Sequence, residues 1–198
     1  MSKLFIDCGT NLGQGLRQIN KSLNFINNSD WIIHCFEPNP NIDLSKELSD
    51  ISNKIIHKEA VFTENTLLKF RSQNTNGGGS RLEDINKLCD PTNVKLEFFE
   101  VQTCDFTDFF ADQVEKYKEI HVKLDIEGAE YPVLNKMKSL GLLKYIDTLY
   151  LEQHYRFNYL RDEWENNSFS AVSRQISDYE RTYLDDLRKD IKHVIRWD

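Results

Sequence analysis

Apolar and polar positions along this chain follow two alternating patterns. Short continuous apolar runs are typical of buried strands, and apolar residues at every third or fourth position are typical of amphipathic helices. The runs predict strands at Leu4–Ile6, Trp31–Phe36, Ile55–Phe62, Ile120–Asp125, Ile146–Glu152 and His193–Trp197. The helical spacing predicts helices at Leu12–Asn27, Ile42–Ser49, Ala129–Leu140 and Ala171–Lys189. Two added strands are expected in the less regular middle, at Leu67–Arg71 and Lys95–Thr103, on either side of the glycine-rich stretch 72–81.

Strands that alternate with helices predict an α/β fold in which a mostly parallel sheet carries helices on both faces. The 198 residues suffice for one domain with a sizeable core. In such sheets, ligands bind beyond the carboxyl ends of the strands, near the point where the strand order reverses. Four predicted strands end at or next to an acidic residue, namely Asp7, Glu37, Asp125 and Glu152. Because burying unpaired carboxylates is costly, four of them at one edge of a sheet favour a functional site.

The first turn, "DCGTNLG" at residues 7–13, connects a strand to a helix through two glycines. Such a turn lets a ligand lie against bare backbone near the positive end of the helix. It is neither the G-x-G-x-x-G pattern nor a Walker loop, and on its own it can also be a tight connection without a ligand. Glu37, at the end of the second strand, can accept both hydroxyls of a ribose or lie as a solvated strand end. Together the two features favour a nucleoside ligand, and S-adenosylmethionine fits them better than NAD does.

Four motifs, "DCGTNLGQ", "FEPNP", "EAVF" and "KLDIEGAEYPVL", follow one another in this order. Together they resemble the FkbM family of S-adenosylmethionine-dependent methyltransferases, whose patterns are close to D-x-G-A-N-x-G, F-E-P and K-x-D-x-E-G-A-E. The resemblance runs from about Leu4 to His154. It implies a Rossmann-like class I methyltransferase fold and O-methylation, often of sugars or natural-product hydroxyls. The cofactor-binding residues expected on this basis are Asp7, Gly9, Thr10, Asn11, Gly13, Glu37, Ala60, Val61 and Asp125, with Ala60 and Val61 near the adenine.

The chain departs from the family pattern in two ways. Thr10 stands where the family has a smaller residue. The chain also starts on its first predicted strand and stops after one late strand, where methyltransferases of this fold usually have extra N-terminal structure and a final hairpin. We therefore expect residues 1–198 to form a single methyltransferase domain, such as one excised from a longer protein. A second resemblance is to the methyltransferase part of a multidomain glycan-building protein of a large DNA virus.

Methyl transfer to an alcohol requires that the acceptor be aligned and that its proton be removed. Asp125 and Glu152 end neighbouring predicted strands, and His154 follows two residues later on the same side, so these three form the predicted catalytic cluster. His154 has the natural pKa for a base, and a neighbouring carboxylate would hold it in one tautomer. The cluster can instead hold Mg²⁺ or Mn²⁺, with Asp125 and Glu152 as ligands, or have a structural role. Glu127 and Glu130 are expected at a helix start, where acids meet the helix dipole.

The aromatic-rich segment 155–169 can either stack on a sugar or pack as a lid on the core. The net charge of -7 argues against a nucleic-acid groove held by phosphate contacts. No apolar run approaches the roughly 20 residues of a membrane span, so no membrane partner is expected. The four cysteines, Cys8, Cys35, Cys89 and Cys104, lie far apart and are expected as reduced thiols in the cytoplasm, or in the host cytoplasm if the protein is viral.

The sequence therefore predicts an S-adenosylmethionine-dependent O-methyltransferase that acts on a sugar hydroxyl of a glycan or on another small hydroxyl compound. Two alternatives remain open. One is an NAD-type oxidoreductase, although its glycine fingerprint is missing. The other is a catalytically inactive domain that binds a nucleoside or a partner protein.

Overall fold

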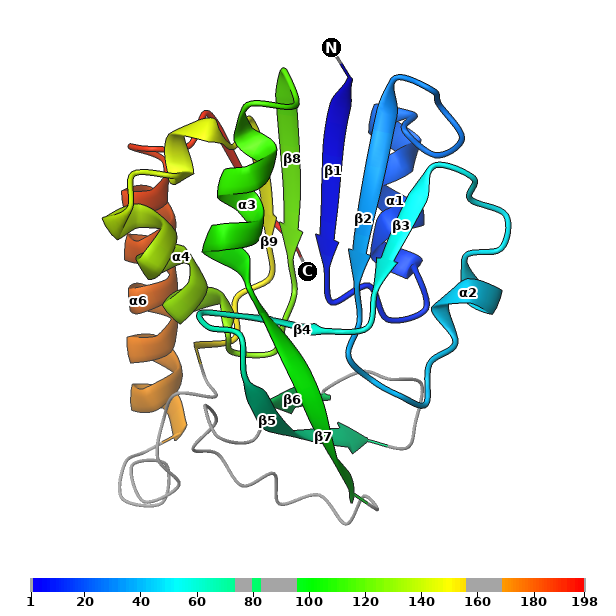
Figure 1. Ribbon diagram of the computed structural model, residues 1–198. Coiled ribbons are helices and arrows are strands. Elements are labelled where there is room, and N and C mark those ends of the chain that lie inside the picture. Colours follow the sequence, from blue (N-terminus) through cyan, green and yellow to red (C-terminus); the bar gives the residue numbers. More distant parts are fainter. Residues whose placement is uncertain (1, 74–79, 83–95, 156–168, 198) are drawn as a thin grey trace.

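The main sheet has six strands, and every hydrogen-bonded pair of strands in it is parallel (Figure 1). The computed structural model describes residues 2–73, 80–82, 96–155 and 169–197. In sheet order the strands are β10 (His193–Arg196), β9 (Thr148–Leu151), β8 (Glu119–Leu124), β1 (Lys3–Cys8), β2 (Trp31–Phe36) and β3 (Lys54–His57). The chain enters the sheet at β1, in its middle, and adds β2 and β3 on one side. It then crosses to the other side of β1, where it forms β8, β9 and β10. The strand order thus reverses between β1 and β8, and the predicted Rossmann-like fold is confirmed.

Helices cover both faces of this sheet. The helices are α1 (Gln14–Leu23), α2 (Leu44–Glu47), α3 (Phe106–Val114), α4 (Glu130–Ser139) and α6 (Phe169–Leu187), with a short 3-10 helix η1 (Leu143–Tyr145). Successive residues of a strand point to opposite faces. Phe5 of β1 therefore packs with Leu16 of α1, whereas Leu4 packs in a different cluster with Phe106 of α3 and Val133 of α4.

A second, smaller sheet lies beyond the carboxyl ends of the main strands (Figure 1). Its strands, in order, are β4 (Ala60–Phe62), β7 (Leu96–Asp105), β5 (Leu67–Gln73) and β6 (Arg81–Leu82). β7 runs parallel to β4 and antiparallel to β5. The two sheets therefore enclose the edge at which the acidic strand ends meet.

Three predicted elements differ from the observed ones. The predicted strand Ile55–Phe62 is two strands, β3 and β4, which belong to different sheets. The predicted helix Leu12–Asn27 is shorter, because left-handed backbone at Gly13 and Asn24 limits α1 at its two ends. The predicted helix Ile42–Ser49 contains only the short α2. In addition, α3 was not predicted at all.

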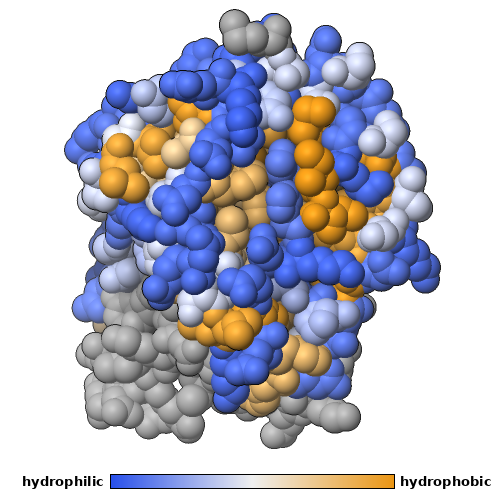
Figure 2. All heavy atoms as spheres, in the orientation of Figure 1, coloured by the Kyte–Doolittle hydropathy of each residue, from blue (hydrophilic) through white to orange (hydrophobic). Residues whose placement is uncertain are grey.

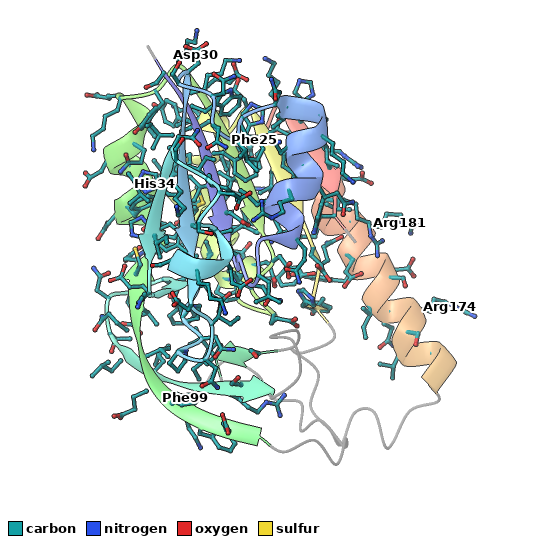
Figure 3. All side chains as sticks on the ribbon, turned by 90° about the vertical axis from the view of Figure 1, so that its right-hand side faces the viewer. Phe25, Asp30, His34, Phe99, Arg174 and Arg181 are labelled. Carbon is teal, nitrogen blue, oxygen red and sulfur yellow. The ribbon has the colours of Figure 1, made fainter. Side chains whose placement is uncertain are left out.

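The last helix presents charged side chains to solvent. Figure 3 shows Arg174 and Arg181 pointing outward from α6, whereas Phe25 lies between α1 and the sheet. Arg181 pairs with Asp178 on the exposed face of α6. On the face seen in Figure 2, hydrophilic side chains cover most of the described surface and apolar ones form separate patches. Within the described residues, no helix has the length and apolar character needed to cross a membrane.

The described cysteines, Cys8, Cys35 and Cys104, are free thiols, as expected. Cys89 lies outside the described residues, as do most of the glycine-rich stretch 72–81 and residues 156–168 of the aromatic-rich segment.

Candidate active site

A cavity of about 270 Å³ opens at the carboxyl ends of the main strands. Six of the residues predicted to bind a cofactor line it: Gly9, Asn11, Glu37, Ala60, Val61 and Asp125. The second sheet contributes Phe70 and Leu82 to the wall. Of the predicted catalytic residues, Asp125 and Glu152 line the cavity. The strand-end acids therefore share one site, except for Asp7, which lies behind it.

Asp7 anchors the first turn through Lys123, the penultimate residue of β8. Both side chains are buried, and Lys123 Nζ lies 3.2 Å from Asp7 Oδ1 and 3.1 Å from Asp125 Oδ2. The ammonium also donates to the Gly9 carbonyl oxygen at 3.1 Å. Burial alone would lower the pKa of Lys123, but attraction to Asp7 and Asp125 raises it above its usual value. Lys123 thus stays charged and joins the ends of β1 and β8.

The two glycines of the first turn are required by close packing. Both have a left-handed backbone, with φ of 78° at Gly9 and 83° at Gly13. A Cβ on Gly9 would lie 1.8 Å from the carbonyl oxygen of Asp125, and one on Gly13 would lie 2.6 Å from a methyl carbon of Leu48. The sequence-based interpretation explained these glycines by a ligand against bare backbone. The structure adds a second cause, which is the approach of neighbouring protein segments.

Glu37 is buried at the end of β2 and holds two backbone turns. Its Oε2 accepts from the Asn11 amide at 2.8 Å, and its Oε1 accepts from the Asn39 amide at 2.9 Å. Burial raises the pKa of Glu37 to about 6, although both hydrogen bonds act in the opposite direction. Each carboxylate oxygen has a second lone pair available for a ligand donor. Asn11 adds a further acceptor, since its buried Oδ1 has no hydrogen-bond partner among the described residues.

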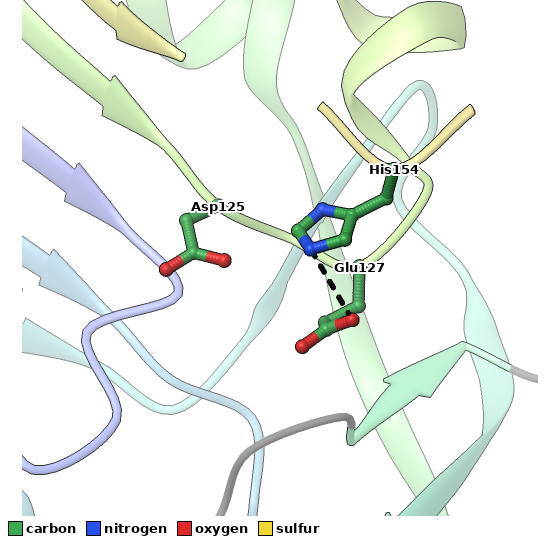
Figure 4. Close-up of side chains that lie close together, drawn as sticks. All are labelled: Asp125, Glu127 and His154. Carbon is green, nitrogen blue, oxygen red and sulfur yellow. Dashed lines mark ion pairs between the residues drawn. The ribbon is translucent and has the colours of Figure 1, made fainter. Parts of the chain in front are cut away.

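The structure brings Asp125, Glu152 and His154 together, as predicted, but with His154 behind the carboxylates. His154 is 1% exposed, and it is not among the described residues that line the cavity. Its Nε2 lies 3.2 Å from Glu152 Oε1 and 3.5 Å from Glu127 Oε2 (Figure 4 marks the second contact). Its Nδ1 lies 2.9 Å from Glu130 Oε1. Burial lowers the pKa of His154, but hydrogen bonds to Glu130 and Glu152 outweigh this and raise it well above its usual value.

The two carboxylates in the cavity wall differ in their environments. Burial raises the pKa of Asp125 to about 6, with Lys123 opposing this change and Glu152 adding to it. The hydrogen bond from His154 lowers the pKa of Glu152. Neighbouring acids whose pKa values are driven apart are typical of sites that move protons.

Glu127 and Glu130 have specific roles that the helix-dipole interpretation missed. Glu130 is fully buried and accepts backbone amides from Ile126 at 2.8 Å and from Gly128 at 2.9 Å, in addition to its contact with His154. Glu127 precedes α4 in a left-handed conformation with φ of 54°, and its side chain lines the cavity. A left-handed backbone in a residue other than glycine is strained, and such strain is common at functional sites.

Asp125, Glu127 and His154 could hold a metal ion. One ligand atom from each lies within 4.8 Å of the ligand atoms of the other two (Figure 4). This set shares Asp125 with the metal pair expected from the sequence, but it includes Glu127 and His154 in place of Glu152.

Tyr155 is the first residue of the aromatic-rich segment 155–169. Its ring stacks on Tyr179 of α6 with centroids 3.6 Å apart. One face of Tyr155 is therefore covered by protein, which fits packing against α6 at this position.

Comparison with known proteins gives one family match. Residues 7–189 match the family model described as the methyltransferase FkbM domain. A search of curated proteins gives no match. Among solved structures, the yeast methylglyoxal/isovaleraldehyde reductase Gre2 complexed with NADPH is similar, with a TM-score of 0.45 and 8% sequence identity. That alignment covers 98% of this chain and 53% of the reductase chain. The second resemblance, to a viral multidomain protein, finds no support in these matches.

Proposed function

The chain belongs to the FkbM methyltransferase family, and we propose that it transfers a methyl group from S-adenosylmethionine to a hydroxyl group of a sugar in a glycan. One observation carries this proposal. A single cavity joins the acceptor atoms of Glu37 and Asn11, which suit a nucleoside, to the carboxylates of Asp125 and Glu152, which suit proton removal.

The residues present fit the adenosine part of S-adenosylmethionine. Glu37 can accept ribose hydroxyls with its remaining lone pairs, and the buried Oδ1 of Asn11 needs a donor. Ala60 and Val61 are buried and apolar and supply a wall suited to a base. When bound, S-adenosylmethionine supplies a methyl group activated by its sulfonium.

Asp125 and Glu152 are the groups placed to take the acceptor proton. Both carboxylates line the cavity, so an acceptor hydroxyl bound there can donate its proton to an oxygen of this pair. His154 holds Glu152 through Nε2, and Glu130 holds His154 through Nδ1. The role of His154 as the base stays a prediction. Since both its nitrogens face carboxylates, it would first have to lose a proton to serve as one.

A sugar acceptor is supported by the apolar part of the cavity wall. Phe70 and Leu82 of the second sheet present apolar surface to the cavity, which suits the C–H face of a sugar ring. The carboxylates in the same wall can accept hydroxyl protons. The Mg²⁺ or Mn²⁺ expected at Asp125 and Glu152 also stays a prediction.

Two measurements on the full chain test the proposal. In calorimetry, S-adenosylhomocysteine should bind at one site and NAD should not. With methyl-labelled S-adenosylmethionine and a panel of monosaccharides and glycans, the label should appear in an alkali-stable ether. Binding of NAD in place of S-adenosylhomocysteine would favour an oxidoreductase. Binding of S-adenosylhomocysteine without transfer to any acceptor would favour an inactive domain.

A further inference from the structure

The cluster around His154 is rich in carboxylates. Glu127, Glu130 and Glu152 contact His154, and Asp125 contacts Glu152. All four residues come shortly after β8 or β9 in the sequence. Carboxylate oxygens are ligands that Mg²⁺ and Mn²⁺ prefer, so the cluster is suited to a cation.

The ligand atoms have the spacing that one ion requires. A divalent ion with oxygen ligands at about 2.0–2.6 Å places neighbouring ligand atoms roughly 3 Å apart and opposite ones roughly 4–5 Å apart. The ligand atoms of Asp125, Glu127 and His154 all lie within 4.8 Å of one another. The contact between His154 Nε2 and Glu127 Oε2, 3.5 Å long, falls in the range for neighbouring ligands.

The contact with Glu130 also orients His154 as a metal site requires, and a cation at Nε2 would replace the proton on that nitrogen. Glu130 accepts from Nδ1, and its own two oxygens are held by the amides of Ile126 and Gly128. A histidine that donates one N–H to a carboxylate presents the lone pair of its other nitrogen, which is the usual arrangement around a metal-bound histidine. That other nitrogen, Nε2, faces Glu127 and Glu152.

We propose that Asp125, Glu127 and Nε2 of His154 bind one divalent cation, with Glu130 as the positioning residue. Carboxylate oxygens suit Mg²⁺ and Mn²⁺, and the imidazole nitrogen shifts the preference toward Mn²⁺. The role of the ion rests on the proposed function. It would acidify an acceptor hydroxyl in the cavity, and Glu152, which lies outside this ligand set, would take the proton.

The test is a titration of the chelator-treated full chain with MnCl₂, followed by the electron paramagnetic resonance signal of free Mn²⁺. The variants are Glu127→Gln, His154→Gln and Glu130→Gln. Glu115→Gln is the matched control, because Glu115 is an exposed glutamate at the end of α3. Circular dichroism and melting curves establish that each variant is folded. If His154→Gln does not fold, Glu127→Gln carries the test, because Glu127 lines the cavity.

One Mn²⁺ should bind per chain, and Glu127→Gln and His154→Gln should each weaken binding by at least about tenfold. Loss of the outer carboxylate in Glu130→Gln should weaken it by about 10–100-fold. The control should bind as the unmodified chain does. Absence of one-site binding at millimolar Mn²⁺, or undiminished binding by folded Glu127→Gln, would overturn the proposal. Calorimetry with S-adenosylhomocysteine on the same samples separates the two ideas, because neither cation binding nor its loss in these variants requires the cofactor.

Discussion

Glu130 Oε1 lies 2.9 Å from Nδ1 of His154, although 24 positions separate the two residues in the sequence. The same carboxylate closes the left-handed turn at Glu127 and Gly128 through the amides of Ile126 and Gly128. One fully buried side chain therefore sets both the orientation of the imidazole and the loop that carries Glu127 into the cavity.

Glu130→Gln should destabilise the protein by about 1–3 kcal/mol. The amide has one acceptor oxygen, and its NH₂ group would face a backbone N–H or the N–H of His154, so at least one buried donor would lose its partner. The measurement is the free energy of unfolding in urea. The exposed Glu115→Gln should stay within about 0.5 kcal/mol of the unmodified chain. If Glu130→Gln also stayed within that range, Glu130 would not be holding the turn.

Gly9→Ala should destabilise the protein more than Gly141→Ala, although both glycines have a positive φ. Each substitution places a side chain in left-handed backbone, which costs roughly 1–2 kcal/mol. At Gly141, which has φ of 66°, a Cβ meets nothing within 4 Å, whereas at Gly9 it would overlap the Asp125 carbonyl oxygen. We expect at least about 1–3 kcal/mol of additional loss at Gly9 from overpacking. Equal losses in urea denaturation would contradict this account of the first turn.

The sequence predicted the strands of the main sheet well because each contains a short apolar run, and the central strands β9, β8, β1 and β2 are buried on both faces. It could not show that the run Ile55–Phe62 divides between two sheets, since both halves are apolar strands and only tertiary packing assigns them to a sheet. The missed helix α3 did have a local indication. Asp105 caps it by accepting from the amide and hydroxyl of Thr107, and a capping aspartate before a helix is visible in a sequence.

The candidate site was predictable where it depends on strand ends. Asp125 and Glu152 come together because the carboxyl ends of neighbouring parallel strands meet at one edge. The contributions of Glu127 and Glu130 were not predictable in the same way. They depend on a left-handed turn and on a buried contact with His154, and neither follows from helical spacing or charge pattern.

Glu37→Ala should weaken S-adenosylhomocysteine binding by about 1.5–3 kcal/mol, the usual value for a hydrogen bond to a charged group. The proposed function gives Glu37 the ribose hydroxyls, and calorimetry on the folded variant measures the loss. Because Glu37 also holds the Asn11 and Asn39 amides, a melting curve is needed to show that the turns remain in place. Unchanged affinity in a folded variant would remove Glu37 from the cofactor site.

Binding of S-adenosylhomocysteine should also weaken as the pH falls below about 6. The pKa of Glu37 is raised to about 6 by burial, so the carboxylate is ionised above that value and gains a proton below it. The ionised form is the better acceptor for ribose hydroxyls, and affinity should therefore be highest above pH 6. Calorimetry between pH 5 and pH 8 measures the change. Glu37→Gln should lose this dependence, and a variant that kept it would assign the titration to another group.

Glu152→Gln should lower turnover while leaving cofactor affinity nearly unchanged. Glu152 lines the cavity with Asp125 but, unlike Asp125, makes no ion pair with Lys123, which holds the first turn. Its loss should thus affect the acceptor proton more than the turn that faces the cofactor. Removing a base that acts in the transition state typically costs about 10²- to 10⁴-fold in rate. Single-turnover methylation, calorimetry with S-adenosylhomocysteine and melting temperature measure the three quantities separately, with Glu115→Gln as the control. A fall in turnover of less than about tenfold in the folded variant would exclude Glu152 as the proton acceptor, and Asp125 or His154 would then have to take the proton.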